Sequence, residues 1–203
     1  MRPSVLSISS SRQHGFSLLE VLVSVIVLSF GVLGMVGLQA AALKSNRDAR
    51  LQSEALGLAR ELAEIMRANP SVATKTAEAD NPYLGNFKTG GMVPRSPSNC
   101  LDTSSTARCV DNVAVANAQM TEWLARADRV LPGIRVVVCM DTAPYDAEGL
   151  PQWGCTAPTS AEQNISFIKL GWTREDTERQ IRQATDNGVR PYVILPVTPG
   201  GQL

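Results

Sequence analysis

The sequence predicts an α+β fold in which a long N-terminal helix packs on a small antiparallel β-sheet head. An apolar run occupies residues 16–38, and apolar residues continue at helical spacing as far as residue 65. Three β-rich runs bounded by turn residues follow in the second half of the chain. At 203 residues with 44% hydrophobic residues, the chain is long enough to bury one sizeable core.

The apolar run 16–38 has 23 residues, which is long enough to span a bilayer as a helix. Before it, Arg2 and Arg12 are the only charged side chains, as the positive-inside rule expects of a cytoplasmic flank. A cleaved secretory signal is the alternative, with its apolar core at 21–30 and its small residues at 40–42. The length of the run and the carboxylate within it favour a retained anchor.

That carboxylate, Glu20, lies near the start of the apolar run. Inserting a charged side chain at mid-bilayer depth costs about 2.5–3.5 kcal/mol on insertion scales. A carboxylate in this run therefore indicates a functional site and needs a partner. Cleavage after Gly15 would create an α-amino group on Phe16, roughly one helical turn from Glu20. On a neighbouring subunit in staggered register, this amino group would face the carboxylate. The pattern therefore predicts assembly.

The helix is expected to continue over residues 39–69 as an amphipathic segment. Apolar residues recur there at spacings of four, three, four and three, and charged side chains occupy the other face. Asn69-Pro70 ends the pattern, because the residue before proline is biased out of the α region. The apolar stripe consists of Leu51, Ala55, Leu58, Leu62 and Ile65.

Three glycines, Gly31, Gly34 and Gly37, lie near the end of the apolar run. Each lowers helix propensity by about 0.8–1 kcal/mol relative to Ala, so this stretch is the weakest part of the long helix. Glycines here suit close packing against another helix. They equally suit a place where the helix loosens when subunits enter a filament, and the spacing does not decide between the two.

Residues 71–111 are rich in Ser, Thr, Asn, Pro and Gly and predict a long surface segment with little regular structure. A second amphipathic helix is expected from a capping Asp111 or Asn112 to the turn at 132–133, with Trp123 in the core. Residues 174–187 are strongly polar and predict an exposed loop or a short helix. The expected strands are 134–140, 165–173 and 191–197.

The chain has four cysteines, and all of them follow the apolar run, whereas Arg2 and Arg12 precede it. In an oxidising compartment an even count predicts disulfides, and four cysteines allow three connectivities. We favour Cys100 with Cys109 and Cys139 with Cys155, each contributing about 2–4 kcal/mol. A zinc site of four thiolates is the alternative, but the short gaps of structural zinc sites are missing.

Composition argues against several classes of function. The net charge of the whole chain is zero. Without residues 1–15, which contain two arginines and no acidic residue, 17 basic and 19 acidic residues remain, so the net charge is −2. A nucleic-acid-binding domain would be basic. The one histidine, His14, precedes the apolar run, so the rest lacks the commonest general base and metal ligand. Asp141, Asp146 and Glu148 lack calcium-loop spacing and predict a solvated loop. We expect no catalysis, no cofactor, no metal and no nucleic acid.

Residues 15–20, Gly-Phe-Ser-Leu-Leu-Glu, resemble the processing and methylation motif of type IV prepilins and of the pseudopilins of type II secretion. Residues 31–40 (GVLGMVGLQA) and 53–70 (SEALGLARELAEIMRANP) further resemble the PilV family of minor pilins, also called type IV pilus modification proteins. The detailed resemblance covers residues 13–70, and the strand ending in Trp172 is compatible with it. The resemblance implies a type IV pilin-like fold.

The resemblance also implies four segments. Residues 1–15 would be a leader that is removed, and residues 16–38 a transmembrane helix that later enters the filament core. Residues 39–69 would continue this helix, and residues 70–203 would form a periplasmic head with disulfide-tied loops. A prepilin peptidase would cleave between Gly15 and Phe16 and methylate Phe16, after which the subunit would wait in the inner membrane.

The function that the resemblance implies is that of a minor pilin, which primes type IV pilus assembly and joins the complex at the pilus tip. Its expected partners are the prepilin peptidase, other minor pilins, the major pilin and a pilus-tip adhesin, with Glu20 as the assembly residue. A minor pseudopilin of type II secretion is the nearest alternative, although the large segment 71–131 favours the pilus. A signal-anchored periplasmic binding domain, with an incidental Glu20, is the other.

Overall fold

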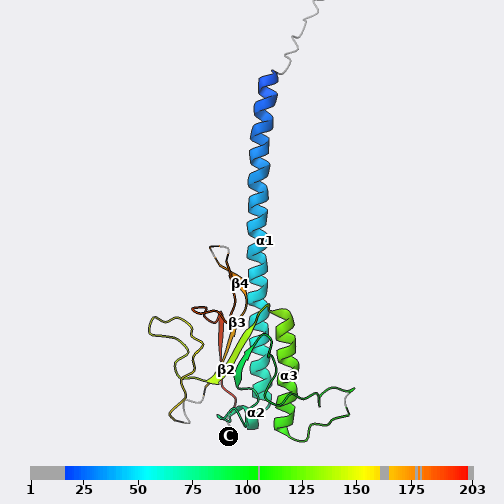
Figure 1. Cartoon of the computed structure of the whole chain (residues 1–203), viewed down its shortest axis with the longest axis vertical. Coiled ribbons are helices and arrows are strands. Elements are labelled where there is room, and N and C mark those ends of the chain that lie inside the picture. Colours follow the sequence, from blue (N-terminus) through cyan, green and yellow to red (C-terminus); the bar gives the residue numbers. More distant parts are fainter. Residues whose placement is uncertain (1–16, 105, 161–164, 177, 179, 201–203) are drawn as a thin grey trace, which may run out of the picture. The chain divides into compact units, whose positions relative to one another are not determined.

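The computed structural model describes residues 17–104, 106–160, 165–176, 178 and 180–200. The chain divides into two units, residues 1–47 and 48–203. Helix α1 (Leu18–Ala68) begins in the first unit and ends in the second. A long apolar N-terminal helix followed by a small antiparallel sheet of four strands is an α+β, type IV pilin-like architecture, as the sequence predicted (Figure 1).

The predicted stop of the long helix at Asn69-Pro70 is confirmed. Helix α1 ends at Ala68, and the short helix α2 (Pro70–Ala73) starts with the proline, which has no N–H to leave unpaired. Asn69 itself is 7% exposed. Its Nδ2 donates to the Asn112 carbonyl oxygen (2.9 Å) and to the Tyr83 hydroxyl (3.3 Å). The residue that follows α1 is therefore held by hydrogen bonds to two later segments of the chain.

The sheet of the second unit is antiparallel throughout, in the order β1-β2-β3-β6. Three of its strands fall inside the predicted β-rich runs, and the second long helix starts where its cap was expected. Asp111 is the cap, with its carboxylate accepting the Ala114 N–H at 2.7 Å. The bounds are β1 (Gly85–Lys88), α3 (Asn112–Val130), β2 (Arg135–Met140), β3 (Ser166–Gly171) and β6 (Val193–Val197).

The core of the second unit lies between the two long helices and one face of the sheet. The predicted apolar stripe of α1 supplies buried Ala55, Leu58 and Leu62. Trp123 of α3 is 0% exposed, as predicted, and its indole N–H donates to the Leu58 carbonyl oxygen at 3.2 Å. A buried indole needs such a partner, and this bond links α3 to α1 at Leu58.

Two stretches differ from the sequence prediction. Strand β1 lies inside segment 71–111, which was expected to have little regular structure. Its sequence, Gly-Asn-Phe-Lys, has only one buried apolar side chain, Phe87. The strand forms because it pairs with β2. Within 174–187, a two-stranded hairpin of β4 (Arg174–Glu175) and β5 (Ile181–Arg182) replaces the expected loop or helix.

Candidate functional site

The N-terminal site predicted from the sequence is described from residue 17 onward, and the expected cleavage and methylation residues, Gly15 and Phe16, lie outside the described residues. The Ser17 carbonyl oxygen accepts the N–H groups of Glu20 (2.9 Å) and Val21 (3.2 Å) as α1 begins. Glu20 therefore lies in the first turn of α1. A carboxylate there is favoured by the positive end of the helix dipole.

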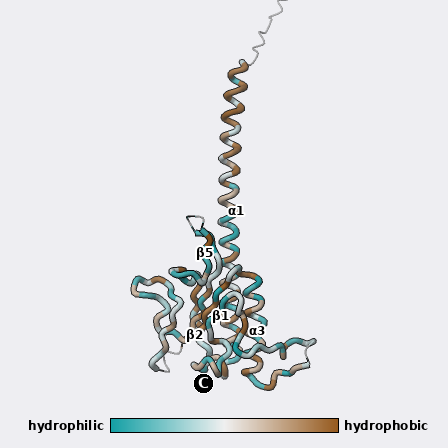
Figure 2. Tube along the Cα trace, in the orientation of Figure 1, coloured by the Kyte–Doolittle hydropathy of each residue, from teal (hydrophilic) through white to brown (hydrophobic). Residues whose placement is uncertain are grey.

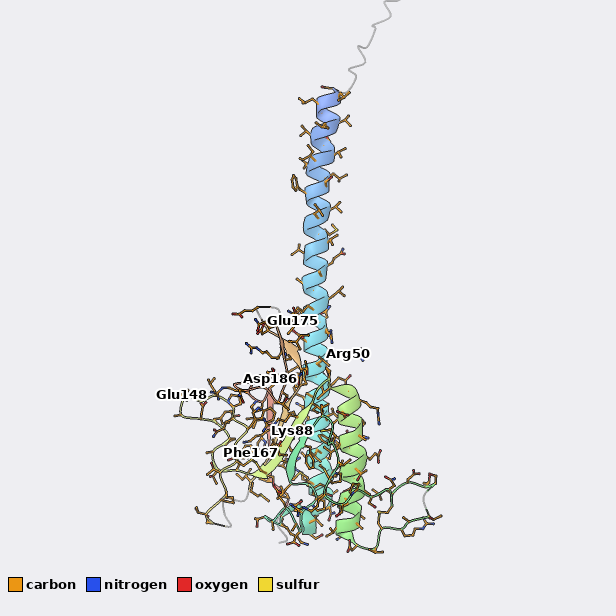
Figure 3. All side chains as sticks on the ribbon, viewed as in Figure 1. Arg50, Lys88, Glu148, Phe167, Glu175 and Asp186 are labelled. Carbon is orange, nitrogen blue, oxygen red and sulfur yellow. A yellow bond between two sulfur atoms is a disulfide. The ribbon has the colours of Figure 1, made fainter. Side chains whose placement is uncertain are left out.

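The part of α1 that belongs to the first unit carries an apolar surface on every side. Its large apolar side chains are exposed, from Leu18 (85%) through Phe30 (71%) to Leu38 (75%). Figure 2 shows this hydrophobic colour along the N-terminal part of α1, and Figure 3 shows its side chains projecting outward all round. By length and composition, α1 contains a segment that could cross a membrane. Within the described chain, no ion pair involves the Glu20 carboxylate.

The three glycines of the apolar segment have open surroundings. A Cβ placed on Gly31, Gly34 or Gly37 meets nothing within 4 Å. Steric crowding inside the described chain therefore does not require glycine at these positions. Close packing would need a second helix, and loosening would need only the low helix propensity, so both interpretations stay open.

Two disulfides tie the loops of the second unit, with the pairing expected from the sequence. Cys100 is bonded to Cys109 and Cys139 to Cys155, with Cα–Cα distances of 5.1 and 6.4 Å. The first bond closes a loop beside α3. The second joins β2 to a loop that lies against the sheet, so all four sulfur atoms are bonded in pairs.

The acidic loop at Asp141, Asp146 and Glu148 was expected to be solvated, and for Asp141 this was wrong. Asp141 is 1% exposed, and its Oδ2 lies 2.6 Å from Nζ of Lys169, which is itself 0% exposed. Sequence reasoning missed this pair because a lysine in a β-rich run is ordinarily expected on the solvated face. The signal present was Lys169 inside an otherwise apolar strand.

Asp146 is also engaged, in a tight turn at the tip of the same loop. Its Oδ1 accepts the N–H groups of Leu150 (2.8 Å) and Glu148 (3.1 Å), and its Oδ2 lies 2.5 Å from the Arg190 guanidinium. The hydrogen bond from Leu150, followed by the Arg190 contact, lowers the pKa of Asp146 below its ordinary value despite some desolvation. Glu148 lies at the outer end of this loop (Figure 3).

The turn at Asp146 is expected to loosen in acid. Because the folded pKa is lowered, the stabilisation is present above the unfolded value of about 3.9 and is lost as pH falls through the folded pKa. The amide NMR shifts of Gly149 and Leu150, followed from pH 6 downward, check this. Asp146→Asn should remove most of the pH dependence, whereas the neighbouring control Glu148→Gln should retain it. An unchanged acid transition in Asp146→Asn would contradict the assignment.

Comparison with known proteins bears on the N-terminal site. Residues 10–36, which contain Gly15, Phe16 and Glu20, match the family model described as the prokaryotic N-terminal methylation motif. This motif is the signal of type IV pilins and pseudopilins, and with the architecture above it supports a place in the prepilin-like superfamily. No curated protein and no solved structure matches the chain. The match implies processing by a prepilin peptidase and association with membrane and pilin assemblies.

Proposed function

We propose that this chain is a minor pilin of the PilV kind, which helps prime type IV pilus assembly and forms part of the pilus tip complex. The observation that carries the proposal is a carboxylate in the first turn of an exposed apolar helix, within a matched N-terminal methylation motif. Proteins with this motif are typically structural, and we propose no catalytic role for the chain.

In this proposal, residues 1–15 are removed by cleavage between Gly15 and Phe16, and the new amino group of Phe16 is methylated. Residues 16–38 anchor the chain in the inner membrane, residues 39–69 continue the helix, and residues 70–203 form the periplasmic head. The two disulfides support this location of the head, because such bonds persist in oxidising compartments.

Assembly then depends on Glu20. In apolar surroundings an ionised carboxylate is stabilised by a cation, and the Phe16 amino group of a neighbouring subunit would supply one. Helices of non-identical minor pilins would complete such pairs and bury their exposed apolar surfaces in a small complex, before the major pilin adds. A tip-associated adhesin would join this complex, which links the chain to twitching motility and cell adhesion.

The test is the N-terminus of the native chain in the membrane and sheared-surface fractions, determined by mass spectrometry. An N-methylated Phe16 in both fractions is the expected result. A start near Leu43 would instead identify a cleaved secretory signal, and an intact Met1 in cells with active prepilin peptidase would equally contradict the proposal.

A minor pseudopilin of a type II secretion system is the second candidate, because the matched motif is shared by both classes. The segment between α2 and α3 favours the pilus, since this disulfide-tied loop and the helix after it make a large head for a short pseudopilin. Deletion distinguishes the two candidates. Loss of twitching with normal exoprotein secretion supports the minor pilin, and the reverse supports the pseudopilin.

A further inference from the structure

The sheet of the second unit carries a buried lysine on the face opposite the helices. Ile168 and Leu170 of β3 belong to the core beneath α1 and α3. Side chains alternate along a strand, so Lys169 between them lies on the other face. Its side chain is nevertheless 0% exposed. Residues 141–156, here called the strap loop, provide its cover.

Lys169 joins the two ends of the strap loop to the sheet. Its Nζ donates to Asp141 Oδ2 (2.6 Å) at the start of the loop and to the Gly154 carbonyl oxygen (2.5 Å) near the end. The other oxygen of Asp141 accepts the N–H groups of Ala143 and Thr156, both at 2.9 Å. One ammonium and one carboxylate thus organise both ends of the loop.

Trp153 adds a further contact between the strap loop and the sheet. Its indole N–H donates to the Val189 carbonyl oxygen at 2.8 Å, and the Arg135 guanidinium carbon lies 4.3 Å from its ring centroid. A Cβ on Gly171 of β3 would come within 2.8 Å of the ring, so glycine is what lets the indole lie against the strand. The Cys139–Cys155 disulfide also joins the base of the loop, through a bond to β2.

We propose that the Lys169–Asp141 pair, and not the Cys139–Cys155 disulfide, holds the strap loop on the sheet. A disulfide acts mainly by restricting the unfolded chain, so its loss leaves the folded loop in place. Removal of the lysine leaves the Asp141 carboxylate buried without a cation, which favours opening of the folded loop into water. The half-exposed Tyr145 and Leu150 of the loop therefore stay displayed whether the disulfide is oxidised or reduced.

Hydrogen exchange of the full-length chain in detergent micelles tests this proposal at the N–H groups of Ala143 and Thr156. In Lys169→Met, with the disulfide intact, exchange at both should accelerate by at least about a hundredfold. In Cys139→Ser/Cys155→Ser, which keeps the Cys100–Cys109 bond, exchange should accelerate less than in Lys169→Met, because the folded-state contacts of the loop remain and only the opened loop gains freedom. Lys88→Met, at an exposed lysine of β1, is the matched control and should exchange as the wild type does.

Exchange in the double serine variant as fast as in Lys169→Met, or wild-type exchange in Lys169→Met, would overturn the proposal. If Lys169→Met does not fold, Asp141→Asn takes its place. This variant keeps an oxygen acceptor for the two N–H groups, but replaces the oxygen that accepts from Lys169 with an NH2 donor, so it breaks the ion pair and should also accelerate exchange. Reduction of the wild-type chain with dithiothreitol opens both disulfides without a substitution, and retained protection at Ala143 and Thr156 supports the pair as the holding contact.

Discussion

Glu20→Ala is expected to be processed normally but to reach sheared surface filaments in amounts lower by at least about tenfold. Its N-terminus should be the same methylated Phe16 as in the wild type, because the substitution lies beyond the cleaved bond. The measurements are mass spectrometry of the N-terminus and the amount of the chain in the sheared fraction, in cells that carry their own pilus machinery.

The expected loss follows from the position of the carboxylate. Glu20 lies in the first turn of a helix whose large apolar side chains are exposed, and the described chain offers it no ion-pair partner. Alanine removes the charge and keeps the helix, and in the proposed assembly it would leave a neighbouring Phe16 amino group without a counter-ion in an apolar interior. Removing one partner of a buried ion pair costs about 3–5 kcal/mol, which is ample for a tenfold defect.

Ser24→Ala is the matched control for this experiment. Ser24 lies one helical turn after Glu20, and its hydroxyl donates to the Glu20 carbonyl oxygen at 2.7 Å within the same helix. The substitution removes a polar group from nearly the same place but removes no charge, so incorporation should stay normal. Wild-type amounts of Glu20→Ala in the filaments would refute the role given to this carboxylate.

The elements that could be predicted from the sequence are those whose signals are local. The stripe through Leu58 and Leu62, the stop at Asn69-Pro70 and the Asp111 cap depend on spacings within a few residues. The approximate ends of β2 and β3 along the chain were predictable for the same reason, since turn residues flank each short β-rich run. The pairing of neighbouring cysteines also follows a short separation in the chain.

What could not be predicted depends on contacts between distant segments. Strand β1 has little β propensity of its own and exists because β2 offers a free edge, 47 or more residues later along the chain. Lys169 is buried because a disulfide-closed loop covers the face of the sheet on which it lies. The alternation of apolar and polar residues along β3 does not predict this cover. The contact with Lys169 also buries Asp141, although the polar residues around it in the sequence predicted a solvated loop.

The N-terminal site is a different case, because its evidence is the motif more than the geometry. Glu20 is described in the first turn of α1, whereas the bond expected to be cleaved lies outside the described residues. Nothing in the packing of the second unit reports on that bond. A substitution at the expected cleavage site is therefore the direct way to test it.

Gly15→Leu is expected to block processing, so that the chain accumulates with residues 1–15 attached. We expect a peptidase site shaped for glycine before the cleaved bond to disfavour a branched side chain there by steric overlap. The retained segment would also keep Arg2 and Arg12 next to the apolar helix. Because these charges are costly to place in an apolar filament interior, the precursor should be absent from sheared filaments.

Gly31→Leu is the matched control, since it makes the same change inside α1. A Cβ at Gly31 meets nothing within 4 Å, so the chain itself accommodates the larger side chain, and cleavage upstream should proceed. Mass spectrometry should therefore find methylated Phe16 in Gly31→Leu and an N-terminus within residues 1–15 in Gly15→Leu. If Gly15→Leu instead begins at Phe16 in wild-type amounts, the cleavage does not depend on this glycine, and the assignment of the motif to prepilin processing is wrong.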